Sequence, residues 1–203
     1  LVKGITQFNG YYGCDFCDIR GEYTNSRMFF PEVGRKRSDE SFRTQINAEH
    51  HKSQSPCLKL NIDMIFAFPV DPMHCIDLGV VKRLLLLWKS GPKPYRLSAG
   101  QLSVLSDSSF SLRKFFPREF NRKPRGFQEL KLWKATEFRT FLLYTGVVIL
   151  KSVLPTDNYE HFLYLSIAVR ILYSEKYVRT LKAYASELLS CFVENAVHLY
   201  SSN

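Results

Sequence analysis

Two cysteines near the start of the chain have the spacing of a metal-binding pair. Cys14 and Cys17 end the run Gly-Tyr-Tyr-Gly-Cys-Asp-Phe-Cys, which spans residues 10–17. A Cys-x-x-Cys turn brings two thiolates within reach of one tetrahedral zinc ion, and the flanking glycines permit a tight backbone. A closed structural site needs two further ligands, so the run predicts half of a zinc site. A redox pair and two incidental thiols are the alternatives.

The other ligands of such a site would have to come from more distant parts of the sequence. None of the available side chains repeats the two-residue spacing of the first pair. These side chains are His50, His51, Cys57, His74 and Cys75. The chain has five cysteines, an odd number with uneven spacing, which favours reduced thiols over a disulfide framework.

A carboxylate and an imidazole stand just before an expected helix. Asp71 precedes His74 by three residues in Asp-Pro-Met-His, and a helical pattern of apolar residues follows at once. At a helix start, where backbone amides favour anions, such a pair could meet a phosphate or a metal-bound water. Alternatively, Asp71 caps a turn before Pro72, and His74 is a core histidine bonded to a backbone carbonyl.

A third group of residues could bind a phosphate backbone. Between residues 113 and 139 the basic side chains outnumber the acidic ones, and phenylalanines are interleaved among them. A loop anchored by aromatic rings can display guanidinium groups to DNA, whereas a solvated basic face is the alternative. The predicted DNA-binding residues are Arg113, Lys114, Arg118, Arg122, Lys123 and Arg125.

The composition sets limits on the protein that carries these residues. With 203 residues, of which 45% are apolar, the chain can bury a core, and its formal net charge of +9 favours polyanionic partners. The longest apolar stretches, 84–88 and 141–154, fall short of the roughly 18 apolar residues that a membrane-spanning helix needs. The N-terminus has no pattern of a secretion signal. We therefore expect no membrane span and an intracellular location.

The elements that must position these side chains are mostly helices. Up to about residue 78, Gly, Asn, Asp and Pro separate short apolar runs, which predicts loops and short strands. Beyond that point helical spacing predominates, and Gly91-Pro92 ends the first helix. The expected helices cover 77–90, two short segments beginning at Ser98 and Ser109, 127–154 with a kink at Gly146, 156–174 capped by Thr156 or Asp157, and 175–200. The predicted fold class is mainly α.

Five segments, in chain order, resemble one family of DNA transposases. Besides the run at 10–17, they are Arg-Met-Phe-Phe-Pro at 27–31, Asp-Pro-Met-His-Cys-Ile-Asp-Leu-Gly-Val at 71–80, Trp-Lys-Ala-Thr-Glu-Phe-Arg at 133–139 and Tyr-Glu-His-Phe-Leu at 159–163. Together they resemble the CACTA (En/Spm)-type transposase domain. The resemblance implies cut-and-paste transposition by an RNase H-like core, interrupted by a helical insertion, with acidic residues that bind divalent metal such as magnesium.

The resemblance also implies a division of the chain and roles for its residues. Residues 1–90 would be the end of an interrupted RNase H-like α/β core with a zinc knuckle at Cys14 and Cys17, and residues 91–203 the helical insertion. His74 would orient groups or handle a proton near the scissile phosphate. Asp71 would support His74 and would not be one of the acids that bind the catalytic metal.

In the family pattern the catalytic acids would precede Leu1 and follow Asn203. We therefore expect an internal fragment that does not cleave DNA by itself, from a parent that acts in the nucleus on transposon ends, as a homo-oligomer. A second hypothesis is a non-catalytic, zinc-stabilised DNA-binding or host-recruited scaffold module derived from a transposase. A third is a helical bundle that binds proteins and no nucleic acid.

Overall fold

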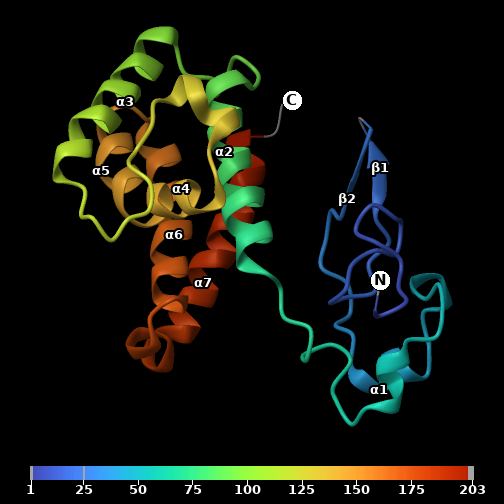
Figure 1. Cartoon of the computed structure of the whole chain (residues 1–203). Coiled ribbons are helices and arrows are strands. Elements are labelled where there is room, and N and C mark those ends of the chain that lie inside the picture. The colour runs from blue at the N-terminus through green and yellow to red at the C-terminus, as the bar shows by residue number, and fades with distance from the viewer. Residues whose placement is uncertain (1, 25, 201–203) are drawn as a thin grey trace. The chain divides into compact units, whose positions relative to one another are not determined.

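The computed structural model describes residues 2–24 and 26–200, and the chain divides after Val70 into two compact units. It is mainly helical, as predicted (Figure 1). The division falls earlier than the expected boundary near residue 90. The reason is that Leu84, Leu85 and Trp88, from the first long helix, are buried in the core of the second unit.

The sheet of the first unit is a two-stranded hairpin. Strand β1 (Glu22–Thr24) pairs antiparallel with β2 (Arg27–Phe29), and Tyr23 lies opposite Met28. No further strand is found in the described part of the chain, apart from isolated bridges. The residues described here therefore show a mainly helical protein and no RNase H-like sheet.

Short helices complete the first unit. They are α1 (Asp39–Arg43), η1 (Ala48–His50) and η2 (Pro56–Lys59). Ser38 begins α1 with a reciprocal cap: its hydroxyl accepts from the Ser41 amide, and the Ser41 hydroxyl accepts from the Ser38 amide. Phe42, Met64 and Ile65 form a small buried core.

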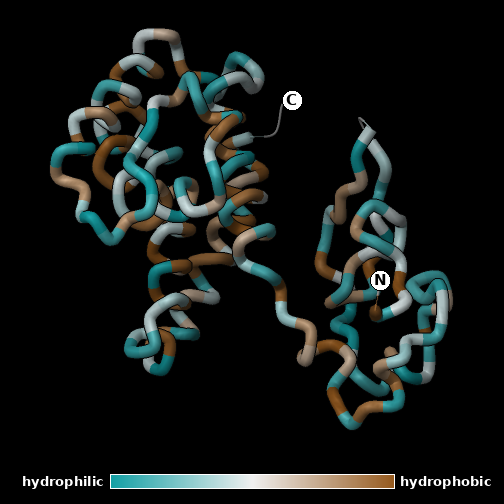
Figure 2. Tube along the Cα trace, in the orientation of Figure 1, coloured by the Kyte–Doolittle hydropathy of each residue, from teal (hydrophilic) through white to brown (hydrophobic). Residues whose placement is uncertain are grey.

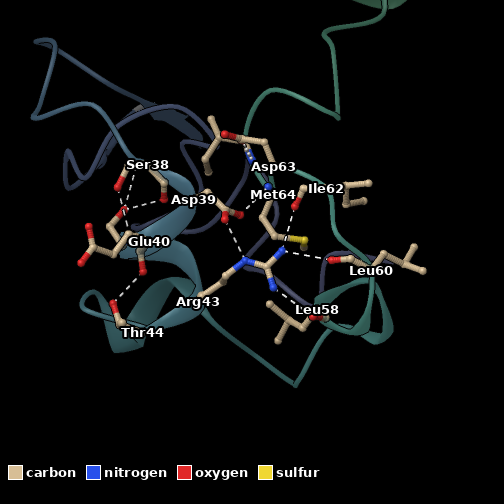
Figure 3. Close-up of polar contacts among 12 residues, drawn as sticks. Ser38, Asp39, Glu40, Arg43, Thr44, Leu58, Leu60, Ile62, Asp63 and Met64 are labelled. Atoms are coloured by element: carbon tan, nitrogen blue, oxygen red, sulfur yellow. Dashed lines mark hydrogen bonds and ion pairs between the residues drawn. The ribbon is translucent and has the colours of Figure 1, made fainter.

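An arginine holds the irregular backbone of this unit in place (Figure 3). Arg43 donates from Nε to Asp39 Oδ2 at 2.8 Å, from Nη1 to the Leu58 carbonyl at 2.9 Å and from Nη2 to the Ile62 carbonyl at 2.8 Å. The other oxygen of Asp39 accepts from the Met64 amide at 2.8 Å. These bonds satisfy backbone groups that have no helix or sheet partner. A polar clamp thus supplements the small core.

The second unit begins with a π-helix, η3 (Met73–Val81), which continues as α2 (Lys82–Ser90). One helix, α3 (Ala99–Leu112), and a 3-10 turn, η4 (Arg113–Phe115), follow where two short helices were predicted. Ser98 caps α3 as expected. The hydroxyls of Ser106 and Ser109 donate to the carbonyls of Leu102 and Leu105, so these serines stay within the helix and do not break it.

A bent helical run crosses the core. Its segments are η5 (Phe127–Leu132), α4 (Ala135–Thr140), the π-helix η6 (Phe141–Thr145), α5 (Gly146–Ile149) and η7 (Leu150–Ser152). Gly146, the predicted kink, lies where η6 passes into α5. A Cβ atom there would come within 2.8 Å of the Phe162 ring, so close packing requires glycine at this bend.

Helices α6 (Thr156–Leu172) and α7 (Glu175–Tyr200) form the last hairpin. The predicted cap of α6 is wrong, because Pro155 precedes the helix and makes no side-chain cap. The contact of α7 with its neighbours runs through Ala185, Leu188 and Phe192. Tyr177, Leu181 and Tyr184, which the sequence places on the same face, are exposed. In the first half of α7, Ala185 therefore takes the buried position, and the larger side chains around it face solvent.

The distribution of hydropathy follows this packing. Figure 2 shows hydrophobic and hydrophilic residues interleaved along the helices. Over the described residues, no helix is both long enough and apolar enough to pass through a lipid bilayer.

Candidate functional site

The two cysteines predicted to bind zinc lie together in the first unit. Their Sγ atoms are 3.3 Å apart. Cys17 is buried and Cys14 is half-buried, and burial raises the pKa of the Cys14 thiol. The Cys14 carbonyl accepts a hydrogen bond from Arg37 Nε at 3.2 Å, which fixes the turn. The turn therefore presents two sulfur atoms to one point, as the spacing predicts.

The side chains considered as further ligands are placed differently. His50 is buried, its Nδ1 lies 2.7 Å from the Tyr12 carbonyl, and its Nε2 has no partner among the described residues. Cys57 packs against the small core around Phe42. His74 and Cys75 belong to the second unit. Within residues 2–24 and 26–200, no three metal-ligating side chains come together.

Asp71 and His74 form a hydrogen-bonded pair at the start of the second unit. Asp71 Oδ2 lies 2.5 Å from His74 Nδ1, and Asp71 Oδ1 accepts from the Met73 amide at 2.9 Å. The hydrogen bond from His74 is the main cause that lowers the pKa of Asp71. The His74 side chain is 70% exposed, so it is not a core histidine. With Nδ1 donating to the carboxylate, Nε2 is the nitrogen open to solvent.

About one helical turn after His74, the buried carboxylate of Asp77 pairs with Arg139. Asp77 is fully buried, and its Oδ2 accepts from Nε of Arg139 at 3.0 Å and from Nη2 at 2.8 Å. Burial raises the pKa of Asp77, and Arg139 opposes that shift. The guanidinium also stacks on Tyr173, 5.2 Å from the ring centroid. No role was predicted for Asp77 from the sequence, although an acid inside an apolar helical stretch is a signal for such a pair.

Arg125, one of the predicted DNA-binding residues, has internal partners. Its Nε and Nη2 donate to the two carboxylate oxygens of Glu137 at 2.7 and 2.9 Å, and Nη2 also donates to the Leu132 carbonyl at 2.6 Å. Glu137 accepts in addition from the Lys134 amide and so begins α4. Burial acts to raise the pKa of Glu137, but the bonds from Arg125 and Lys134 lower it. Arg125 therefore holds the loop in place.

The other predicted DNA-binding residues are exposed. Arg113 stacks on Phe110 and Lys114 on Phe115, with cation-to-centroid distances of 5.9 and 4.9 Å. The remaining members make no hydrogen bond or ion pair with any described residue; they are Arg118, Arg122 and Lys123. Five cationic side chains are thus presented to solvent on and beside one loop.

Aromatic rings anchor this loop, as the interleaved pattern predicts. Residues 116–126 are irregular, and the Phe116 and Phe120 rings are 4.9 Å apart. The Phe120 ring lies 5.4 Å from that of Tyr144 on η6. Phe115, by contrast, is 72% exposed. We refer to residues 113–125, with this anchor, as the basic loop.

The functional side chains thus form separate groups: the cysteine pair in the first unit, and the Asp71–His74 pair, the Asp77–Arg139 pair and the basic loop in the second. Comparisons with the models of known protein families, with curated proteins and with solved structures find no match to this chain. The function is therefore argued from these groups and from their chemistry.

Proposed function

We propose that this chain is a DNA-binding part of a transposase-like protein with a structural zinc knuckle. The observation that carries the proposal is the basic loop, where aromatic packing and the Arg125–Glu137 pair hold the backbone while five cations remain exposed. Phosphate contacts of this kind supply most of the sequence-independent affinity for DNA. The net charge of +9 adds long-range attraction to a polyanion.

The finer part of the proposal follows the resemblance to CACTA-type transposases. The parent protein would act in the nucleus on transposon ends, as a homo-oligomer with an RNase H-like core. Cys14 and Cys17 suit zinc because their sulfur atoms lie side by side, and the ion would cross-link their turn to further ligands. Among the described residues, no three carboxylate, histidine or cysteine side chains lie close enough together to hold a metal ion, so the acids that bind magnesium in the parent would come from outside these residues.

In the parent protein, His74 would be the group that handles a proton or orients a phosphate. Its exposed side chain and the bond from Nδ1 to Asp71 support this role, because the carboxylate fixes the orientation of the ring. Both carboxylate oxygens of Asp71 accept hydrogen bonds, one from His74 and one from the Met73 amide, as expected for a residue that supports His74.

The competing function is a non-catalytic DNA-binding or scaffold module. Glu137 favours it, because this acid of the transposase-like motif is occupied by Arg125 and by the Lys134 amide in a structural role. Cleavage assays on the full-length parent separate the two functions, since a scaffold module would bind transposon ends without nicking them.

Fluorescence anisotropy with a labelled mixed-sequence duplex tests the DNA-binding function of the chain. We expect binding that weakens steeply between 50 and 200 mM salt, by about a factor of ten for every two phosphate contacts. A triple variant, Arg113→Ala/Lys114→Ala/Arg118→Ala, should bind more weakly and with a shallower salt dependence. Affinity that does not change with salt, or no binding at 50 mM salt, would leave the protein-binding helical bundle as the better function.

A further inference from the structure

A recess of about 250 Å³ lies beside the basic loop in the second unit. Asn121 and Arg122 line it from the loop, and Thr136, Arg139 and Thr140 line it from α4. The polar side chains of two segments that are separated in the sequence therefore converge on one hollow. The predicted DNA-binding residues all lie in the basic loop, although the basic interval that suggested them extends to Arg139 in α4.

Most of the hydrogen-bond donors around this recess have no acceptor among the residues that the structure describes. Arg122, the Asn121 amide and the hydroxyls of Thr136 and Thr140 make no hydrogen bond to any residue that the structure describes. Arg139 uses Nε and Nη2 for Asp77, which leaves Nη1 without a bond in the same part of the chain. Such a set of open donors matches a ligand that offers several acceptor oxygens.

The walls of the recess are held in place before any ligand binds. Asp77 and Tyr173 fix the guanidinium of Arg139, and Phe120 packs on Tyr144 to hold the loop. Arg170 lies over the Tyr144 ring, 5.2 Å from its centroid, and so helps to hold that ring in the lining. Because these groups are already ordered, a ligand would cost less conformational entropy on binding than it would with free side chains.

Charge decides which class of ligand fits. The lining carries two guanidinium groups, from Arg122 and Arg139, and one carboxylate, from Glu119, while Asp77 lies behind Arg139 and Glu137 attracts Arg122. The balance is positive, and Asp77 is already occupied. A cation would meet Glu119 as its only anionic partner in the lining, whereas an oxyanion would meet two arginines and three neutral donors.

We propose that this recess binds a phosphate group. Guanidinium groups with neighbouring hydroxyl and amide donors suit the several oxygens of a phosphate. The source of that phosphate rests on the proposed function: in the DNA complex, the recess takes one backbone phosphate of the strand that crosses the basic loop. The DNA-binding surface then includes Arg139 and α4, and it does not include Arg125, which pairs with Glu137.

The test uses the whole chain, two variants and a matched control. Arg122→Ala removes a side chain that makes no hydrogen bond or ion pair with the described residues, and Arg139→Lys keeps a cation beside Asp77 while removing the guanidinium fork. Arg179→Ala removes an exposed charge of α7 that does not line the recess. Duplex affinity is measured at two salt concentrations, and inorganic phosphate is titrated while the backbone amide signals of Asn121 and Thr140 are followed by NMR. Thermal unfolding checks that each variant is folded.

We expect Arg122→Ala to weaken duplex binding about five- to tenfold and to reduce the salt slope by about one, with a smaller loss for Arg139→Lys and none for the control. Phosphate should shift the Asn121 and Thr140 signals of the wild type and of Arg179→Ala, and shift them less in the two recess variants. If the duplex binds but neither recess variant changes affinity, the recess proposal is wrong and DNA binding stands. If the duplex does not bind, but inorganic phosphate shifts these signals in the wild type and not in Arg122→Ala, the recess proposal is supported and the DNA-binding function is wrong. Absence of both effects overturns both.

Discussion

His50 should make the first unit sensitive to acid. Its side chain is fully buried, with Nδ1 bonded to the Tyr12 carbonyl and Nε2 without a partner among the described residues. Burial lowers the pKa of His50 to about 4, and the positive charge of Arg37 acts in the same direction, against the opposing bond to Tyr12. The imidazole is therefore neutral in the folded protein at pH values where it is charged in the unfolded chain.

The size of the effect follows from this difference. The unfolded chain takes up the proton first, near the ordinary histidine pKa of 6.5, so the stabilisation is complete above pH 6.5 and declines as the pH falls towards 4. A shift of about 2.5 pKa units corresponds to about 3 kcal/mol in total, of which about 2 kcal/mol is already lost at pH 5. A loss of this size is a large fraction of the stability of a small unit.

The assay is hydrogen exchange of backbone amides over residues 39–65, corrected for intrinsic rates, at pH 7 and pH 5 without metal. Asparagine at position 50 provides the control, because its amide can still donate to the Tyr12 carbonyl and does not titrate. We expect the opening free energy of the wild type to fall by about 2 kcal/mol more than that of His50→Asn between these pH values. Equal pH dependence in the two proteins, or a His50 ring signal that titrates near 6.5 by NMR, would refute the reasoning.

Three further predictions concern the other groups. Zinc that co-purifies with the protein under reducing conditions should be lost from a Cys14→Ser/Cys17→Ser variant by atomic emission; equal zinc in both would remove the pair from the site. In urea denaturation, Arg125→Ala should lower the free energy of unfolding by about 2 kcal/mol, because it leaves Glu137 buried without its cation, whereas Lys123→Ala should change it little. A larger loss for Lys123→Ala than for Arg125→Ala would contradict the structural role of the Arg125–Glu137 pair. In the full-length parent, His74→Ala should reduce strand cleavage far more than DNA affinity, and parallel losses of folding and cleavage would count against a proton-handling role.

Local patterns predicted most of the helices correctly. Leu84, Leu85 and Trp88 recur at helical spacing and are buried as expected, because one apolar face suffices to place α2 against a core. The serines of α3 misled the prediction. A serine inside a helix can bond to the preceding turn instead of capping a new helix, and the sequence does not distinguish the two. Ser106 and Ser109 both take the first option.

The sequence predicted the types of residue in the candidate sites better than it predicted which residues pair with one another. The spacing of Cys14 and Cys17 fixes their proximity, since a turn of that length leaves few alternatives. The role of Arg125 depends on Glu137, twelve residues away, and nothing local marks it among the other cations of the loop. Asp77 and Arg139 are 62 residues apart in sequence, so only the packing of η3 against α4 reveals their pair.

The division of the chain after Val70 has a consequence for cooperativity. Each unit has its own buried core, a small one around Phe42 and a large one around Trp88 and Phe141. Two cores of such different size need not melt together, so one melting temperature does not describe the chain. A ligand that binds the first unit would raise the melting temperature of the transition in which that unit unfolds. Calorimetric traces of this protein are therefore to be fitted with two transitions, each assigned through the ligand that moves it.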